Sequence, residues 1–278
     1  MTIREALRLA AARLEQAGVP DADVDAAYLL ASVLKEDTLA MRINGHRELA
    51  APQRAAFDAL CDRRAAREPL QYILGETEFM GLTFHVEPGV LIPRADTEIL
   101  VEKALAWMKP GARVLDIGTG SGAIAVSLAK LGRQAQVTAV DVSDRALEIA
   151  RRNAEHNGAT VEFVKSDCFS ALKGRKYDMI VSNPPYISED EMRGLMPEVT
   201  REPELALFGG ADGLDFYRRI SREAPEYLNE GGCLLFEIGW LQKDAVSALV
   251  KAHIGEPFAL RDYGQNWRVV GAKKEGAC

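Results

Sequence analysis

The residues best suited to chemistry form the stretch Asn183-Pro184-Pro185-Tyr186, which directly follows the apolar run 177–182. Two consecutive prolines can neither donate backbone hydrogen bonds nor continue a strand, so they predict a stiff turn with outward-pointing carbonyls. Asn183 adds a side-chain carbonyl, and Tyr186 adds an aromatic face that can lie against a planar group. Acceptors without donors suit a planar NH2 group, so these four residues are predicted to be catalytic. The stretch alone is also compatible with a strand-ending turn that buries a tyrosine.

A second candidate site is a glycine-rich turn between the strand pattern 112–117 and the helical run 123–131. Glycines let the backbone approach a ligand closely, and the start of a helix presents free N–H groups. The turn satisfies the dinucleotide fingerprint, although glycine turns after strands also occur without a ligand. The residues predicted to bind a cofactor here are Gly118, Thr119, Gly120, Ser121 and Gly122.

Acidic residues follow the next two strand patterns. Asp141 ends the strand 136–140, about 20 residues beyond the glycine turn, where a carboxylate would accept both ribose hydroxyls of a nucleoside. Asp167 and Cys168 follow the strand 161–164, where side chains can flank an adenine ring. Asp167 could instead cap the next turn. These three residues complete the predicted cofactor site together with Asn183.

Two cofactor classes fit this pattern. A nicotinamide dinucleotide would use the glycine turn and Asp141, but it would leave residues 183–186 without a task. A sulfonium cofactor has no phosphate to bind, and its positive charge suits Asp116 and Asp141. S-adenosyl-L-methionine is therefore the predicted cofactor, and a nicotinamide-dependent oxidoreductase is the remoter alternative.

Together these motifs resemble the HemK-type protein-(glutamine N5) methyltransferases that modify peptide chain release factors, and the resemblance covers nearly the whole chain. It implies methyl transfer to the side-chain amide nitrogen of the glutamine in the Gly-Gly-Gln motif of class 1 release factors, which supports translation termination. Ala95-Asp96 departs from a common Pro-Glu pair, and Cys168 is smaller than the usual residue. The sequence marks of the family are residues 68–75, 91–98, 118–122, 183–186 and 201–214.

The length and composition agree with an enzyme that buries one or two hydrophobic cores. The chain has 278 residues, of which 47% are hydrophobic and 27% charged. A net charge of -7 argues against stable nucleic acid binding. Without a long apolar stretch or a signal-peptide pattern, the expected location is cytoplasmic, with no membrane contact and a monomer as the default. The cysteines are scattered, so we expect reduced thiols and no metal; they are Cys61, Cys168, Cys233 and Cys278.

The chain is expected to have two domains and a linker. Residues 1–75 show helical spacing and predict a small bundle, to which the resemblance assigns substrate recognition. Residues 76–92 are predicted to form a β-hairpin linker, with extended pieces starting at Gln71. Residues 93–278 alternate strands and helices, which predicts an α/β catalytic domain with a mainly parallel sheet. The resemblance implies a Rossmann-like S-adenosylmethionine-dependent methyltransferase fold with seven strands, the last of them antiparallel.

The expected mechanism is direct transfer of the methyl group to an amide nitrogen. Asn183 and the Pro184 carbonyl would accept the two amide protons, and no general base is needed because a methylated cationic amide is strongly acidic. The polar segment 187–213 is expected to form a flap over the acceptor groove. A DNA or RNA base amino-group methyltransferase could use the same turn on a flipped base, although the acidic charge counts against it.

Overall fold

The computed structural model describes residues 1–274, and their contacts divide the chain into two compact units. Unit 1 comprises Met1–Glu76 together with Met196–Arg201. Unit 2 comprises Thr77–Leu195 and the chain from Glu202 onward. The chain therefore enters unit 2 after the helical region, returns to unit 1 for one short segment, and then completes unit 2.

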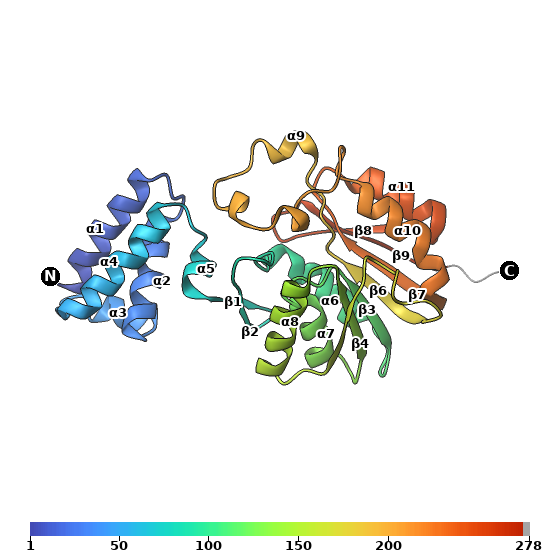
Figure 1. The fold of residues 1–278 in the computed structure, drawn as a ribbon, viewed down its shortest axis with the longest axis horizontal. Coiled ribbons are helices and arrows are strands. Elements are labelled where there is room, and N and C mark those ends of the chain that lie inside the picture. Colours follow the sequence, from blue (N-terminus) through green and yellow to red (C-terminus); the bar gives the residue numbers. More distant parts are fainter. Residues whose placement is uncertain (275–278) are drawn as a thin grey trace. The chain divides into compact units, whose positions relative to one another are not determined.

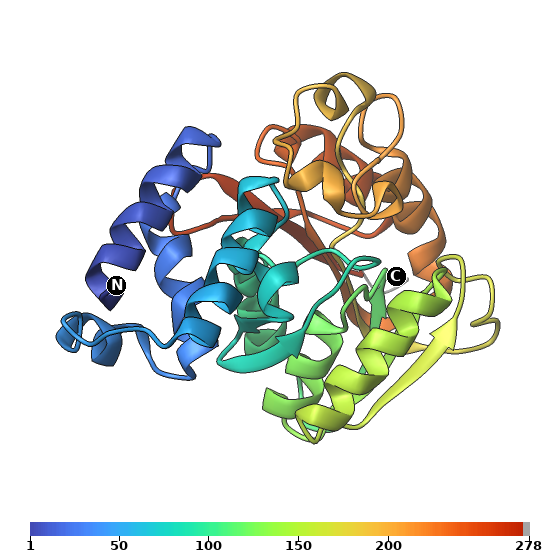
Figure 2. The ribbon, with the colours of Figure 1, turned by 60° about the vertical axis from the view of Figure 1, so that its left-hand side comes forward.

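Unit 1 is a helical bundle whose main helices pack against one another (Figures 1 and 2). Thr2 caps the first helix, since its side chain accepts from the Glu5 backbone N–H while the Glu5 carboxylate accepts from the Thr2 N–H, which is a capping box. Apolar faces of the helices meet in one core that includes Leu14, Leu30 and Phe57. The helices are α1 (Ile3–Gln16), α2 (Ala22–Leu34), α3 (Thr38–Ile43), α4 (Ala51–Ala65) and α5 (Leu70–Leu74).

Helix α5 corrects the expectation of extended backbone from Gln71 onward. Pro69 precedes the helix, and Gly75 ends it in the left-handed conformation with φ +81°. Proline before the first turn and glycine after the last are helix start and stop signals. The single turn buries Tyr72 and Ile73, and tertiary packing therefore decides the structure of a segment too short for its own periodicity to be read.

A buried ion-pair network holds the segment Met196–Arg201 in unit 1. Arg64, whose side chain is 6% exposed, contacts Asp25 at 2.7 Å and Glu198 at 2.8 Å. Arg67 contacts the second carboxylate oxygen of Glu198 at 2.5 Å. Because buried charges are stable only when paired, each member of this network depends on the others.

The predicted hairpin is formed by β1 (Glu76–Phe79) and β2 (Leu82–His85). Both residues of its turn, Met80 and Gly81, have positive φ, as a two-residue turn of type I′ requires. The far end of the hairpin is fixed to α8 (Asp144–His156) by Asn153, whose side chain accepts from the His85 N–H at 2.8 Å and donates to the His85 carbonyl at 3.0 Å.

Unit 2 is built on a seven-stranded sheet of order β5-β4-β3-β6-β7-β9-β8, which confirms the predicted fold class (Figure 1). Neighbours from β5 to β7 run parallel, and β9 is antiparallel to both β7 and β8. The strands are β3 (Arg113–Ile117), β4 (Gln136–Asp141), β5 (Val161–Lys165), β6 (Tyr177–Ser182), β7 (Leu228–Glu237), β8 (Phe258–Arg261) and β9 (Trp267–Lys273).

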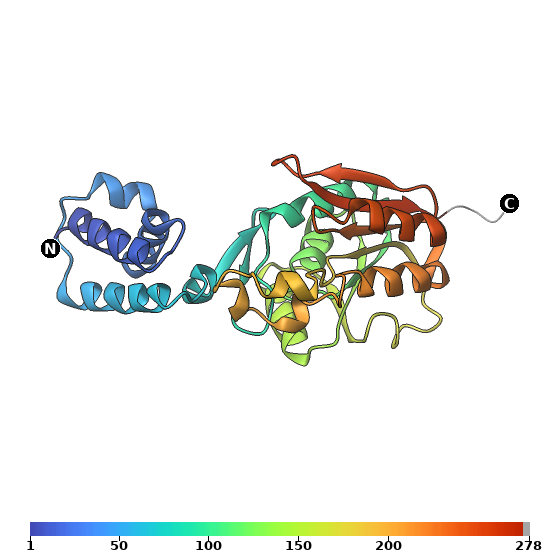
Figure 3. The same cartoon turned by 90° about the horizontal axis from the view of Figure 1, so that it is seen from above.

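Helices cover both faces of this sheet, so its strands are apolar on both sides. Val114 faces a core with α6 (Glu98–Trp107) and α7 (Ala123–Leu131), and the adjacent Leu115 faces the opposite core with α10 (Asp215–Tyr227) and α11 (Lys243–His253). Figure 3 shows α10 and α11 side by side. The shorter elements are α9 (Glu189–Met192) and the 3₁₀ helices η1 (Ala95–Thr97), η2 (Val199–Arg201) and η3 (Glu204–Ala206). Within residues 1–274 no helix has the length and apolarity to span a membrane.

Candidate active site

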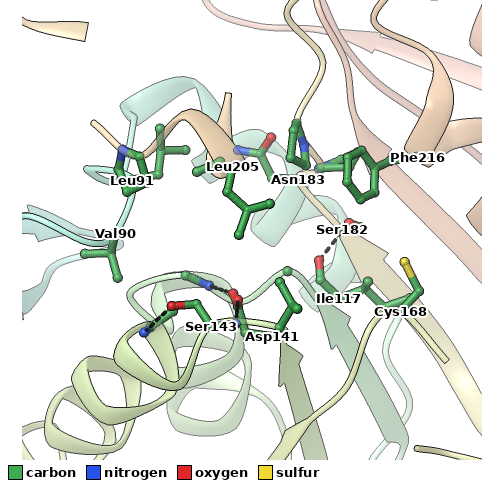
Figure 4. Close-up of a pocket in the computed structure, with 18 of the residues that line it drawn as sticks. Val90, Leu91, Ile117, Asp141, Ser143, Cys168, Ser182, Asn183, Leu205 and Phe216 are labelled. Carbon is green, nitrogen blue, oxygen red and sulfur yellow. Dashed lines mark hydrogen bonds between the residues drawn. The ribbon is translucent and has the colours of Figure 1, made fainter. Parts of the chain in front are cut away.

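A pocket lies at the carboxyl ends of the parallel strands, where β3 and β6 meet and the direction of the strand order reverses (Figure 4). Ligands of open α/β sheets bind at such a switch point because the loops there diverge. The pocket has an empty volume of about 850 Å³, part of which is open to solvent. The predicted residues in its wall are Gly118, Gly120, Asp141, Asp167, Cys168, Asn183, Pro184 and Pro185.

The glycine turn provides a cradle for a ligand. Gly118 has φ +73° and Gly120 has φ +54°, and a Cβ added to either would have no atom within 4 Å. The space above both residues is therefore open on the pocket side, and a side chain would fill it. Only glycine adopts this backbone readily while leaving that space free.

Asp141 lies next to this turn and is held by it. One carboxylate oxygen accepts from the Gly120 N–H at 2.9 Å, and the other accepts from the Ser143 N–H at 2.9 Å (Figure 4). Burial raises the pKa of Asp141, and the backbone hydrogen bonds partly oppose that rise. Each oxygen keeps a further lone pair, so the carboxylate can still accept two hydroxyl groups from a ribose.

Three of the predicted cofactor residues shape the turn and are not among the described residues that line the pocket. Thr119 donates to the fully buried Asp116 at 2.6 Å, and burial raises the pKa of that carboxyl to about 7 although the Thr119 hydrogen bond lowers it. Ser121 is buried, and its carbonyl accepts from the Asn153 side chain. Gly122 starts α7 with φ +83°, and a Cβ there would lie 3.0 Å from the Cβ of Ala150, so it permits close packing of α7 on α8.

Asp167 and Cys168 form another part of the wall. Arg219 of α10 donates to the Asp167 carboxylate at 2.6 Å and to its backbone carbonyl at 3.0 Å, which fixes the loop after β5. Cys168 takes a positive φ of 48° and is 5% exposed. Burial raises the pKa of its thiol to about 11, so Cys168 presents a neutral, weakly polar surface to the pocket.

Asn183 carries an acceptor that no group among residues 1–274 satisfies. Ser182, the last residue of β6, ties this strand to β3 by donating to the Ile117 carbonyl at 2.7 Å. Asn183 follows it, and its Nδ2 donates to the Thr97 hydroxyl at 3.3 Å. The Asn183 Oδ1 is buried without a hydrogen-bond partner among residues 1–274. Because a buried unsatisfied acceptor costs about 1–3 kcal/mol, such a group in a pocket wall indicates a place for a donor from a ligand.

Tyr186 is not among the described residues that line the pocket. Its side chain is half-buried against the core shared by β7 and α10, and burial raises the pKa of the phenol to about 12. Its backbone carbonyl accepts from the Gln242 side chain at 3.0 Å. A Cβ on Gly209 would come within 2.8 Å of the Tyr186 Cα, so the proline turn packs tightly against the chain that follows it.

Sequence reasoning missed several wall residues because distant elements bring them together. The loop after β2 contributes Val90 and Leu91, and α10 contributes Phe216 and Ile220. The family mark at residues 91–98 was the available signal for Leu91, and no mark covers Val90. Part of the expected flap also lines the pocket, through Pro203, Leu205 and Ala206.

The chain from Glu202 to Ala206 is fixed beside the pocket by Glu202, which is 5% exposed. Its carboxylate accepts from the Ile92 N–H at 3.0 Å and pairs with Arg94. One carboxylate therefore joins the sequence mark around residue 92 to the chain that leads into η3.

Neither the cysteines nor the acidic residues form a metal site in the part of the chain that the structure describes. Cys61, Cys168 and Cys233 are buried free thiols, and Cys278 lies outside the described residues.

The open glycine cradle, the acid after β4 and the asparagine acceptor after β6 fit a nucleoside with a positively charged sulfonium. Together with the sheet they are the features of an S-adenosylmethionine-dependent methyltransferase, whose cofactor is S-adenosyl-L-methionine.

Comparison with known proteins gives the same class and a narrower family. Residues 82–201 match the methyltransferase small domain, and residues 5–75 match the PrmC N-terminal domain. The release factor glutamine methyltransferase of Geobacter sulfurreducens is 46% identical over 98% of this chain and 96% of its own length. That of Cereibacter sphaeroides is 43% identical over 100% of both chains. The chain therefore belongs to the release factor glutamine methyltransferase family.

Solved structures show the same fold at low sequence identity. A methyltransferase from Pyrococcus furiosus has a TM-score of 0.56 and 23% identity, with 71% of this chain and 91% of that chain covered. A 16S rRNA methyltransferase from T. thermophilus, solved with AdoMet and guanosine, has a TM-score of 0.53 and 21% identity, with 72% and 50% covered. These likenesses establish the fold and leave the acceptor to be argued from the site.

Proposed function

We propose that this protein transfers a methyl group from S-adenosyl-L-methionine to the side-chain amide nitrogen (N5) of the glutamine in the Gly-Gly-Gln motif of class 1 peptide chain release factors, and so supports translation termination. The observation that supports an amide acceptor most directly is the buried, unpartnered Oδ1 of Asn183 in the pocket wall. The names of the relatives indicate that the glutamine belongs to a release factor.

The cofactor would be held by the carboxyl ends of β3, β4 and β5. The open cradle at Gly118 and Gly120 leaves room for the part of the cofactor that lies against the backbone of the turn. The Asp141 carboxylate accepts hydrogen bonds from the ribose hydroxyls. Asp167 and Cys168 flank the adenine ring from the loop after β5. When bound, S-adenosyl-L-methionine supplies an electrophilic methyl group on a positively charged sulfur.

The residues after β6 act on the acceptor. An amide nitrogen is a poor nucleophile because its lone pair is delocalised into the carbonyl. Asn183 Oδ1 and the Pro184 carbonyl each accept one of its two hydrogens, which turns the nitrogen toward the methyl group. Both hydrogen bonds strengthen as the nitrogen gains positive charge, so they stabilise the transition state more than the bound amide. Water takes the proton that the methylated nitrogen releases.

Tyr186 has two roles in the proposed mechanism. The stacking of its side chain on the flat amide stays a prediction from the sequence, since the ring packs against the core of β7 and α10. Its backbone, held by Gln242 and packed on Gly209, fixes the shape of the proline turn so that the Pro184 carbonyl keeps its direction.

The roles of the domains and the cellular location follow from a release factor as substrate. Residues 1–75 would recognise the release factor, residues 76–92 would link this region to the rest, and residues 93–278 would carry the cofactor and the chemistry. A release factor acts on the ribosome, so the enzyme would work in the cytoplasm. We propose a monomer without stable nucleic acid binding, in line with the net charge of -7.

Transfer of a labelled methyl group tests the acceptor. The purified protein is incubated with labelled S-adenosylmethionine and a class 1 release factor, beside a copy whose Gly-Gly-Gln glutamine is replaced by alanine, and beside RNA and DNA. Label on the unaltered release factor alone is expected. Label that enters RNA or DNA instead would overturn the proposal in favour of base methylation.

A further inference from the structure

The direction of the Asn183 amide decides whether the proposed chemistry works. Its two ends are nearly equal in size, and one accepts hydrogen bonds whereas the other donates them. If the Asn183 NH2 faced the substrate amide, two donors would oppose each other. Some neighbour must therefore distinguish the two ends, and only the hydrogen-bond network can do so.

Thr97 is the neighbour that contacts this amide. It is the last residue of η1 and is 5% exposed. The Asn183 Nδ2 donates to its hydroxyl oxygen at 3.3 Å. A hydroxyl has one proton, so Thr97 selects the NH2 end of Asn183 only if that proton is engaged elsewhere. With the proton free, the hydroxyl could equally donate to Oδ1 and turn the amide around.

Glu237 supplies the other partner. It ends β7, and because Ser182 pairs with Phe236 in the parallel ladder, Asn183 and Glu237 are the next residues of two adjacent strands. Glu237 is 1% exposed, and its Oε2 has no hydrogen-bond partner among residues 1–274. Burial raises the pKa of Glu237 to about 7, and the nearby Thr97 side chain lowers it. The Thr97 proton thus has a carboxylate to which it can be donated.

Charges of both signs surround the Glu237 carboxylate. Arg268, on the neighbouring strand β9, lowers the pKa of Glu237, and Asp96 of η1 raises it. Arg268 itself pairs with Asp96 at 2.9 Å and with Asp262 at 3.0 Å. Arg94 also lowers the pKa of Glu237. Tyr217 of α10 donates to the Glu237 backbone carbonyl at 2.9 Å, which fixes the end of the strand.

We propose that Thr97 and Glu237 are positioning residues that hold the Asn183 amide with its carbonyl oxygen free for the substrate. The Thr97 hydroxyl donates to Glu237, its oxygen can then only accept, and it therefore binds the NH2 end of Asn183. The catalytic consequence of this arrangement rests on the proposed function, whereas the arrangement itself can be tested without any substrate.

Three substitutions separate the proposal from a packing role. Thr97→Val keeps the shape of the side chain and removes the hydroxyl, and Thr97→Ser keeps the hydroxyl and removes a methyl group. Glu237→Leu removes the acceptor for the Thr97 proton at similar volume, and a buried carboxylate replaced by an apolar side chain need not destabilise the fold. Calorimetric titration with S-adenosylhomocysteine checks that each variant keeps its cofactor site.

The first readout is the side-chain NH2 resonance pair of Asn183, assigned by its loss in Asn183→Ala. Thr97→Val and Glu237→Leu are expected to move this pair, and Thr97→Ser is expected to leave it near the wild-type position. An unmoved pair in Thr97→Val would overturn the inference, whatever the enzyme methylates.

The second readout is the single-turnover rate on the release factor. The single-turnover rate of Thr97→Val is expected to be about tenfold lower than that of wild type. A net hydrogen bond is worth about 0.5–1.5 kcal/mol, and each 1.36 kcal/mol is tenfold in rate. Thr97→Ser should stay within about twofold of wild type. The double variant Asn183→Ala, Thr97→Val should have the same single-turnover rate as Asn183→Ala alone, because Thr97 acts only through Asn183. A further tenfold loss of rate in the double variant would contradict this. A wild-type enzyme inactive on release factors would instead refute the proposed function, and the resonance test would still decide the positioning role.

Discussion

Asp141 offers the sharpest test of the cofactor site, through the substitution Asp141→Asn. Each oxygen of this carboxylate already accepts one backbone N–H, from Gly120 and from Ser143. Asparagine replaces one oxygen by an NH2 group, and that group must face one of these two N–H donors. The variant therefore loses one backbone hydrogen bond and one of the two acceptors left for the ribose hydroxyls.

The expected size of the effect follows from these lost contacts. A hydrogen bond to a charged group is worth about 1.5–3 kcal/mol, and 1.4 kcal/mol corresponds to tenfold in Kd. Losing one ribose contact should therefore weaken S-adenosylmethionine binding about tenfold to a hundredfold. The facing donors should also lower the stability of the free protein by about 1–3 kcal/mol.

Isothermal titration calorimetry measures this Kd, with Asp144→Asn as the matched control. Asp144 makes the same carboxylate-to-amide change three positions later, but it is exposed and its partner is the exposed Lys165. An exposed ion pair contributes little, so the control should bind the cofactor like wild type. If Asp141→Asn also bound within threefold of wild type, Asp141 would not hold the ribose.

Three further changes test other parts of the structure. Asn183→Ala should lower the single-turnover rate about 10²–10³-fold, as removal of one oxyanion-type hydrogen-bonding group does elsewhere, while the cofactor Kd measured by calorimetry changes far less. Burial raises the pKa of Glu198, but its arginine hydrogen bonds outweigh burial and bring it to about 2. The resulting stability is complete above the ordinary value of 4.5 and is lost as pH falls toward 2, so thermal melting over this range should decline less in Glu198→Gln. Gly122→Ala should destabilise more than Gly174→Ala in urea titrations, because both have positive φ but only the Gly122 Cβ would meet Ala150; equal losses would contradict the packing role.

The sequence predicted those parts of the fold in which local pattern and tertiary environment agree. The apolar strand 112–117, the glycine turn and the run 123–131 each carry their own signal, and the structure has β3, the cradle and α7 there. The prediction for Leu70–Leu74 was wrong because a single helical turn is too short to show a period. Whether this segment is helical depends on the bundle that buries it.

The site was predictable at strand ends and less so elsewhere. Asp141 and Asn183 follow strands directly, so topology alone brings them to one pocket. Phe216 reaches the same pocket from α10, and no local pattern distinguishes it from an ordinary core residue. Thr97 reaches Asn183 from η1, and Glu237 ends the strand beside β6, and neither relation can be read from the sequence before the strand pairing is known.

The central claim is that the methyl group arrives on the side-chain amide nitrogen of a glutamine. The most direct measurement is acid hydrolysis of a release factor labelled by this enzyme from methyl-labelled S-adenosylmethionine. An N-methylated glutamine side chain hydrolyses to glutamate and methylamine, so the account predicts that the label is recovered as volatile methylamine. Label recovered as methanol, from a methyl ester, or retained in a methylated amino acid such as methyl-lysine would contradict it.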